Sequence, residues 1–281
     1  MEKIKKLRKL LIDENISGYI VPKNDEFFGE YIANYNERLN YISNFSGSNG
    51  FALILKDENY LFVDGRYTLQ ASKQSAKYFK IITFPNKMPY DIFKNKKLSI
   101  GFDPKLFTKK TLKIFFHHKN SKLVPIKNNL IDKIWKRKRK KIKSKFYSLP
   151  KNSAGTNYNF KINKIIINLK KKGADFQFIT ASENVAWLLN IRGADAKYSP
   201  IPNSYILISR NKEIKFFCDL SKVTNSLKKY LKKIKIINIH NTNKILSAIS
   251  KKKFIIDKNS CSFYFENLIS KNNSIINSQD L

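Results

Sequence analysis

Two short turns hold the residue types that could do chemistry in this sequence, and the first is Ser46-Gly47-Ser48-Asn49-Gly50. Its small residues resemble those of a phosphate-binding loop. Such a loop joins a strand to a helix whose first N–H groups bind the anion, and it ends in Gly-Lys-Ser or Gly-Lys-Thr. Here an apolar run, Phe51–Leu55, follows instead. We therefore interpret Gly47 and Gly50 as turn residues that allow positive φ or a close backbone approach.

The second turn, Asp64-Gly65-Arg66-Tyr67, lies between a predicted strand and a predicted helix. Asp64 is suited to cap that helix, because its carboxylate can accept hydrogen bonds from the first free N–H groups. The guanidinium of Arg66 matches a carboxylate with two parallel hydrogen bonds. Two interpretations of Arg66 stay open: an ordinary surface or interdomain ion pair, or a contact with a carboxylate in a neighbouring active site.

The remaining chemically active side chains do not form a complete catalytic set. The histidines are His117, His118 and His240, and the adjacent pair points in different directions on a helix, with no acid three or four residues after it. We therefore predict no metal site. No Gly-x-Ser-x-Gly motif is present. Cys218 and Cys261 lack zinc-type spacing, and we expect reduced thiols in or near a core.

The net charge of +34 raises the question of a nucleic-acid partner. Lysine is spread over nearly every segment, and the aromatic residues do not alternate with arginine as in a base-stacking platform. We interpret the charge as a compositional bias towards Lys, Asn and Ile, and predict no specific nucleic-acid binding. Non-specific binding to polyanions at low salt still follows. The alternative left open is a stand-alone basic module that binds acidic partners or nucleic acid.

Membrane association is not expected from the sequence. No stretch reaches the roughly 18–20 apolar residues that a membrane span needs. The basic N-terminal stretch has neither the apolar core nor the cleavage site of a signal peptide. We expect a cytoplasmic protein.

Apolar spacing and turn residues predict an alternation of helices and strands in the first half of the chain. Apolar residues recur at helical spacing at Ile4, Leu7, Leu10 and Leu11, and short apolar runs end at Pro, Asn or Asp. The predicted helices cover 3–15, 37–42, 66–76 and 108–118, and the predicted strands cover 19–21, 51–55, 60–63 and 98–102, the middle two forming a hairpin.

A strongly basic stretch divides the chain. Residues 136–145, KRKRKKIKSK, carry eight basic side chains in ten positions, and like charges repel instead of packing. We predict a first domain over 1–135, a solvated basic linker over 136–160 and a second domain over 161–281. A nuclear-localisation or RNA-binding tract is the alternative interpretation of the basic stretch.

The second half of the chain repeats the pattern of the first. Matched residues share a nearly constant offset: Gly47 with Gly193 at 146, Asp64 with Asp219 at 155, and Asp103 with Asp257 at 154. The offset increases by nine between the first and the second of these pairs, which indicates an insertion of about nine residues near 196–204. A steady offset of this kind indicates a duplicated α/β domain, each copy a mixed sheet flanked by helices.

Longer motifs resemble a known family. IVPKNDEFFGEY, ERLNYISNFSGSNGFALIL, LFVDGRYTLQASKQ and NNLIDKIW look like the first domain of three-domain Xaa-Pro aminopeptidases, of the creatinase/prolidase group, and SENVAWLLNIRGADAKYSPIPNSYILI looks like the second domain. The resemblance implies two tandem creatinase-N-like domains. Two positions depart from the family: Phe27 stands where it commonly has His, and Asn49 where it commonly has Ala.

The resemblance also implies where catalysis lies. In this family a C-terminal pita-bread domain holds two divalent metals, usually manganese, through two Asp, one His and two Glu. Water between the metals attacks the peptide bond before a proline. None of these ligand motifs occurs here. We therefore expect the N-terminal, non-catalytic portion of such a metallopeptidase, without the pita-bread domain, binding no metal and inactive by itself.

The family further implies a homodimer formed through the N-terminal domains, and short proline-containing peptides as substrates of the parent hydrolase. In such enzymes these domains line the entrance to the active site. The candidates for substrate access or an interface are Asp64, Arg66, Tyr67, Trp187 and Arg192. Gly47, Gly50 and Gly193 are the expected structural positions.

Overall fold

The structure is a computed structural model that describes residues 1–93, 96–116, 121–137 and 144–280. It divides into two compact units. The first comprises Met1–Asp25 and Asn34–Lys140, and the second comprises Glu26–Ala33 and Lys141–Leu281. His117 and His118 lie outside the described residues. No helix of the described residues is both long and apolar enough to cross a membrane.

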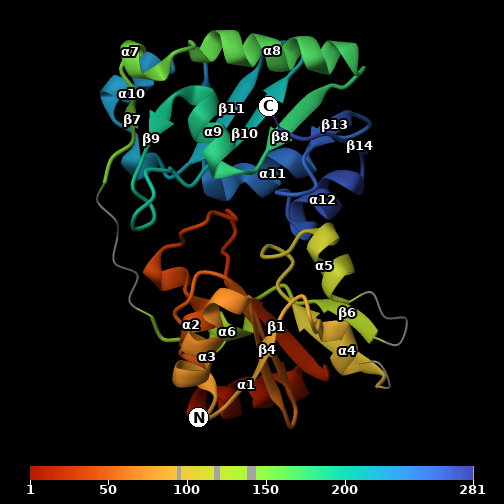
Figure 1. Cartoon of the computed structure of the whole chain (residues 1–281). Coiled ribbons are helices and arrows are strands. Elements are labelled where there is room, and N and C mark those ends of the chain that lie inside the picture. The colour runs from red at the N-terminus through yellow and green to blue at the C-terminus, as the bar shows by residue number, and fades with distance from the viewer. Residues whose placement is uncertain (94–95, 117–120, 138–143, 281) are drawn as a thin grey trace. The chain divides into compact units, whose positions relative to one another are not determined.

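The first unit is built on a six-stranded sheet in the order β4-β3-β2-β1-β5-β6 (Figure 1). Its strands are β1 (Gly18–Pro22), β2 (Gly50–Leu55), β3 (Asn59–Val63), β4 (Lys80–Thr83), β5 (Leu98–Phe102) and β6 (Ser121–Pro125). Its helices are α1 (Glu2–Asp13), α2 (Arg38–Ser43), α3 (Thr68–Ser75), α4 (Pro89–Phe93), α5 (Lys109–Phe115) and α6 (Leu130–Ile134), with short 3₁₀ turns η1 (Asn34–Asn36) and η2 (Gly65–Tyr67).

The second unit has a six-stranded sheet in the order β12-β11-β10-β8-β13-β14. Its strands are β8 (Phe176–Ile179), β10 (Tyr205–Ser209), β11 (Ile214–Cys218), β12 (Lys235–Asn238), β13 (Lys253–Ile256) and β14 (Ser274–Asn277), and β7 (Tyr147–Ser148) pairs separately with β9 (Ile191–Arg192). Its helices are α7 (Lys151–Ala154), α8 (Tyr158–Lys171), α9 (Ser182–Leu189), α10 (Asn225–Tyr230), α11 (Thr242–Ser247) and α12 (Phe263–Ser270), with η3 (Leu220–Lys222) and η4 (Ile239–Asn241).

The predicted duplication is confirmed by the pairing of the strands. In each sheet the central strand, β1 or β8, pairs antiparallel with one neighbour and parallel with the other. The outer pairs also match in direction, since β3–β4 and β11–β12 are parallel, as are β5–β6 and β13–β14. Six residues separate α2 from β2, whereas fifteen separate α9 from β10, so the nine-residue insertion lies where the sequence places it.

The sheet of the second unit is covered on both faces, which explains why its strands are largely apolar. Alternate residues of β10 point to opposite faces. Ile206 and Ile208 pack in a cluster with Ile162 and Ile166 of α8. Leu207 packs in a separate cluster with residues of α11 and α12. Figure 1 shows α8 on one side of these strands and α11 and α12 on the other.

Side chains from helices also pack on the sheet of the first unit. Tyr19 and Val21 of β1 pack in one cluster with Leu7 of α1 and Ile42 of α2. On β2, the ring of Phe51 stacks on Phe115 of α5, with ring centroids 4.3 Å apart. The apolar spacing that predicts the helix over 3–15 is thus the stripe by which α1 covers its sheet.

Regular structure of the second unit begins within the predicted linker 136–160. Phe146 is fully buried in the cluster under α8, and Tyr147–Ser148 forms a strand. Burial of the apolar ring of Phe146 stabilises the fold, whereas burial of unpaired lysine or arginine side chains would not. Helix α8 then begins at Tyr158, capped by the side chain of Asn157. The domain boundaries as drawn from the sequence stay a prediction.

One segment of the first half of the chain belongs to the second unit, which the sequence did not predict. Within Glu26–Ala33, Phe27 stacks on Tyr205 with ring centroids 5.2 Å apart. The hydroxyl of Tyr205 donates to the carbonyl oxygen of Glu26 at 3.0 Å. Phe27, the position that departs from the family pattern, therefore packs on the core of the second unit.

The duplication predicts equal costs for equivalent core truncations. Leu53 of β2 pairs with Ile20 of β1, and Leu207 of β10 pairs with Phe178 of β8, and both leucines are buried. We expect Leu53→Ala and Leu207→Ala each to lower the free energy of unfolding by about 2–5 kcal/mol, because each leaves a cavity. Urea denaturation followed by circular dichroism measures this.

The control is Leu69→Ala, on a residue 69% exposed in α3. It should change the unfolding free energy by no more than about 0.5 kcal/mol. A loss of the same size in all three variants would contradict the two cores described here.

Candidate functional site

Asp64 organises the turn at the end of β3. Its Oδ1 accepts hydrogen bonds from the backbone N of Arg66 at 3.0 Å and from Arg66 Nε at 3.1 Å. Its Oδ2 accepts from Arg66 Nη2 at 2.8 Å and from Asn49 Nδ2 at 2.9 Å. Asp64 thus caps the 3₁₀ turn η2 that precedes α3, and Arg66 forms an ion pair with it.

These hydrogen bonds set the electrostatics of the turn. The side chain of Arg66 donates to the carboxylate, and this is the main reason that the pKa of Asp64 lies below its ordinary value. The same contact raises the pKa of Arg66. The guanidinium remains 74% exposed, although the carboxylate is only 17% exposed. Solvent and salt therefore screen the pair, which orients Arg66 more than it stabilises the fold.

The two turns singled out in the sequence meet on one surface of the first unit, which we call the turn surface: residues 46–50 and 64–67. Besides the Asn49–Asp64 contact, Ser48 Oγ and Tyr67 Oη lie 2.6 Å apart. The rings of Tyr67 and Phe45 are nearly perpendicular, with centroids 5.9 Å apart. Local folding thus brings Asp64, Arg66 and Tyr67 together.

Gly47 and Gly50 are required by close approach, and neither has a positive φ. A Cβ on Gly47 would lie 2.2 Å from the ring of Phe45. A Cβ on Gly50 would lie 2.7 Å from the carbonyl oxygen of Phe62, across the β2–β3 pair. A larger residue at position 50 would press on the paired strand β3, and one at position 47 would displace the ring of Phe45.

The second unit keeps the cap and lacks the arginine. Asp219 follows β11 and accepts a hydrogen bond from the backbone N of Ser221 at 2.9 Å, as Asp64 does from Arg66. The position equivalent to Arg66 is Ser221, which has no charge to offer. The capping aspartate is therefore a feature of the duplicated fold, and the exposed guanidinium distinguishes the first copy.

In the second unit, Trp187 lies in the last turn of α9 and Arg192 lies in β9, which follows it. The ring of Trp187 is half exposed, and Lys161 Nζ lies 4.1 Å from its centroid. Arg192 Nη1 donates to the carbonyl oxygen of Ile191 at 2.9 Å. Gly193 is again required by close approach, since a Cβ there would lie 2.7 Å from the ring of Phe146.

Lys161 is a buried cation that sequence reasoning missed. Its Nζ donates to the carbonyl oxygen of Trp187 and to Asn190 Oδ1, both at 2.6 Å. Burial lowers the pKa of Lys161, and the charge of Arg192 adds to that effect. Both cations lie where the carbonyl groups at the end of α9 favour positive charge. The available signal was a lysine within the apolar stripe of α8.

A second missed pair fixes the nine-residue insertion. Asp195 is 2% exposed and forms an ion pair with Lys222. The other oxygen of Asp195 accepts from the backbone N of Asn203 at 2.7 Å. A buried pair stabilises only when further hydrogen bonds satisfy its charges, as happens here. Its role is to close the inserted loop.

The described residues do not fit a metal site. Among them, no group of three or more His, Cys, Asp or Glu side chains is placed to hold an ion. His240 is exposed in η4. Cys218 and Cys261 are buried free thiols, as the sequence predicts, and burial raises the pKa of Cys218 to about 12.

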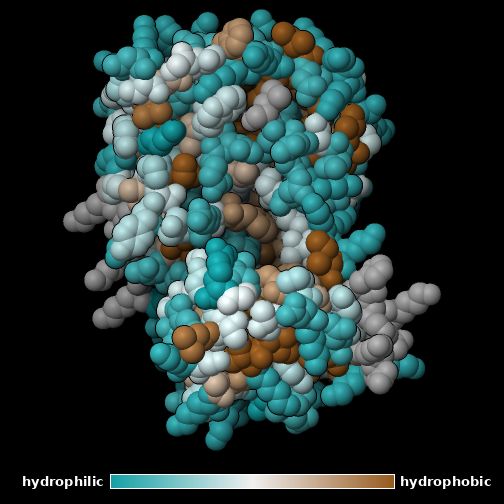
Figure 2. Space-filling view, viewed as in Figure 1, coloured by the Kyte–Doolittle hydropathy of each residue, from teal (hydrophilic) through white to brown (hydrophobic). Residues whose placement is uncertain are grey.

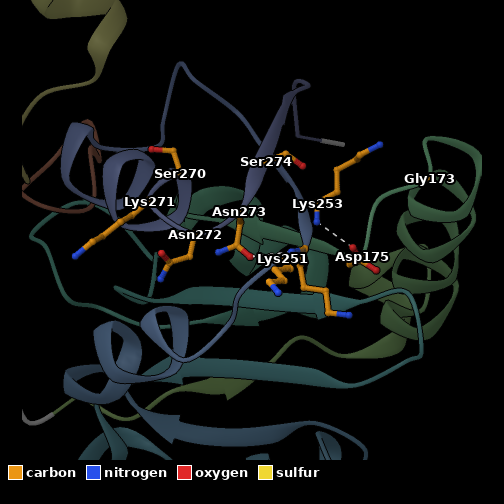
Figure 3. A pocket seen from close by; sticks show the side chains of 10 residues that line it. Gly173, Asp175, Lys251, Lys253, Ser270, Lys271, Asn272, Asn273 and Ser274 are labelled. Atoms are coloured by element: carbon orange, nitrogen blue, oxygen red, sulfur yellow. Dashed lines mark hydrogen bonds between the residues drawn. The ribbon is translucent and has the colours of Figure 1, made fainter.

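A cavity of about 620 Å³ lies on the second unit, at the C-terminal end of α12 (Figure 3). Its lining includes Lys251, Lys252, Lys253 and Lys271. No sequence motif marked these residues. The surface in Figure 2 is largely hydrophilic, with apolar residues in small scattered groups.

Comparison with known proteins identifies the family. The creatinase/prolidase N-terminal domain matches twice, over residues 3–134 and 136–281. A probable Xaa-Pro aminopeptidase P of Laccaria bicolor is 35% identical over 76% of this chain, and Xaa-Pro aminopeptidase 1 of Dictyostelium discoideum is 34% identical over 82%. This chain belongs to the Xaa-Pro aminopeptidase family.

The solved structures agree with this family. The crystal structure of X-prolyl aminopeptidase from Caenorhabditis elegans, described as a cytosolic enzyme with a di-nuclear active site, covers 99% of this chain at a TM-score of 0.88 and 26% identity. The chain covers 50% of that structure. It spans about 35–39% of the length of the two curated aminopeptidases named above.

The Asp64–Arg66 pair of this aminopeptidase-family chain gives a testable pH dependence. The pKa of Asp64 is lowered in the folded state, so the pair stabilises the first unit above the ordinary aspartate range. That contribution is lost as the pH falls through the folded pKa, below about 4. In Arg66→Met, we expect the titration midpoint of Asp64, followed by carboxyl NMR, to move upward.

A matched control is Arg210→Met, which removes an exposed arginine paired with Asp175 in the second unit. It should leave the Asp64 midpoint unchanged, and 1 M salt should shrink the shift produced by Arg66→Met. An unchanged midpoint in Arg66→Met would show that the pair does not form in solution.

Proposed function

We propose that this chain is the N-terminal, non-catalytic portion of a Xaa-Pro aminopeptidase, which removes an N-terminal residue that precedes proline. The observation that carries the proposal is the likeness to the C. elegans enzyme, which spans both units at a TM-score of 0.88. The sequence identity of 35% to an aminopeptidase supports it. We also retain the proposed domains, 1–135 and 161–281 with a linker over 136–160, and a cytoplasmic location.

Catalysis is assigned to residues outside these 281. The described residues offer no metal-binding group, whereas the C. elegans relative is described as di-nuclear. We propose that the parent enzyme uses two divalent metals, Mn²⁺ by preference, to activate water for hydrolysis. The present chain would bind neither metal. Its contributions would be to dimerise the enzyme and to shape access for short proline-containing peptides.

The turn surface is the proposed access element of the first unit. Two hydrogen bonds from its side chain to Asp64 fix the direction of Arg66, and the guanidinium faces solvent. A guanidinium already held in one orientation loses little conformational freedom when it binds a carboxylate. Peptide substrates carry such a group at their C-terminus. Tyr67 adds an aromatic ring, 5.5 Å from the guanidinium carbon.

Trp187 and Arg192 are the proposed interface residues of the second unit. Tryptophan and arginine are enriched among residues that dominate binding energy at protein interfaces. Trp187 presents about half of its surface to solvent. The hydrogen bonds of Lys161 to Trp187 and Asn190 hold the end of α9 in place, so the ring is presented on a rigid element.

Because catalysis is assigned to another domain, we expect the 281-residue chain to show no turnover of an X-Pro peptide with added Mn²⁺. A polypeptide that joins it to the metal-binding part should hydrolyse the same peptide. Release of the N-terminal residue measures both, with EDTA-treated enzyme as the blank. Metal-dependent turnover by the 281 residues alone would overturn the assignment of catalysis to another domain.

Arg66 tests the access role in the joined polypeptide. We expect Arg66→Ala to lower kcat/KM by about fivefold to tenfold, chiefly through KM, because one charge-assisted contact to peptide is lost. Arg210→Ala, the matched exposed arginine, should stay within about twofold of wild type. If both variants match the wild-type kcat/KM and dimerise normally, Arg66 has no access or interface role.

A further inference from the structure

The cavity at the end of α12 is lined by cations that have no acidic partner. None of the ammonium groups of Lys251, Lys252, Lys253 and Lys271 forms an ion pair among the described residues. The single carboxylate of the described lining is Asp175. Its Oδ1 lies 3.3 Å from Arg210 Nη2, and its Oδ2 accepts from the backbone N of Lys253 at 2.9 Å. The negative charge of Asp175 is therefore balanced by Arg210, and the positive charges of the four lysines have no acidic partner.

Hydrogen bonds hold the frame of the cavity together. Asn273 joins the two turns that form it: Oδ1 accepts from the backbone N of Lys252, and Nδ2 donates to the carbonyl oxygens of Ile249 and Ile269. The backbone N of Ser274 donates to the carbonyl oxygen of Lys252 at 3.0 Å. In Figure 3, Lys271 and Lys253 extend on opposite sides, with Asn272 and Asn273 between them.

The field in the cavity remains positive after the local dipoles are counted. The C-terminal ends of α8 and α12 reach its rim, at Gly173 and Ser270. Each helix end carries the equivalent of about −0.5 charge. The two helix ends together contribute about −1 charge, whereas each of the four ammonium groups carries a positive charge. The lysines therefore exceed what is needed to complement the helix ends.

We propose that this cavity binds a compact, multiply charged phosphate anion, of the pyrophosphate or tripolyphosphate class. Four mobile ammonium donors suit an anion whose charge is spread over many oxygens. The side chains of Asn272 and Ser274 lie in the same lining and form no hydrogen bond within the described residues, so they supply neutral donors. The volume of about 620 Å³ admits such an anion together with bound water.

The alternative explanation is the lysine-rich composition, which places cations over the whole surface. A control with the same change of charge separates the two. Lys229, Lys232, Lys233 and Lys235 are exposed, form no ion pair within the described residues, and lie along α10 and β12. Strand β12 forms one edge of the sheet. Strand β14, which follows Lys271 in the chain, forms the other edge.

The test is calorimetric titration of the 281-residue chain with pyrophosphate and tripolyphosphate in about 150 mM salt, where diffuse attraction is screened. We expect one saturable site. Changing the four cavity lysines to Gln should weaken binding at least about tenfold, and the four control changes should alter it less than about twofold. Lys271→Gln alone should weaken it by about twofold to threefold.

Equal weakening in the cavity and control variants would overturn the proposal, because general charge would then explain the binding. No saturable binding of either anion would overturn it too. So would binding of an oligonucleotide or a poly-glutamate peptide that pyrophosphate fails to displace. The substitutions lie on exposed side chains, and thermal unfolding confirms that the variants are folded before titration.

Discussion

The burial of one central strand on both faces is the constraint on which each unit depends. β1 lies between an antiparallel and a parallel neighbour, and β8 does the same in the second copy. Such a strand is largely apolar, with Gln177 of β8 as a buried polar exception, and helices must cover both sides of the sheet. The turns that end the neighbouring strands are thereby held at fixed places, and these include the turn surface of the first unit.

The two copies share a scaffold and differ in what their turns present. Asp64 and Asp219 each cap the 3₁₀ turn after the hairpin, so the duplicated fold keeps the acid for local structure. In the first copy the same carboxylate also orients Arg66. In the second, an inserted loop is closed by the buried Asp195–Lys222 pair. Because function resides in such local additions, the copies have the same topology and different surfaces.

The large positive charge has several physical roles in the structure. Lys161 and Lys222 are buried and bound to oxygen atoms, so they stabilise particular loops and helix ends. Arg66 is exposed and oriented by Asp64. The lysines around the cavity by α12 differ from all of these, because their ammonium groups form neither an ion pair nor a hydrogen bond within the described residues. Composition explains how many cations there are, and their partners determine what each one does.

The sequence by itself determined the features that rest on local spacing. The helix over 3–15, the hairpin of β2 and β3, the cap at Asp64 and the repeat are patterns of neighbouring residues or of constant offset. Tertiary structure alone decided that Phe27 packs on Tyr205, that Lys161 binds the end of α9, and that Lys271 lines the same cavity as Lys251–Lys253. These contacts join residues distant in the chain, and only the folded sheets bring them within reach.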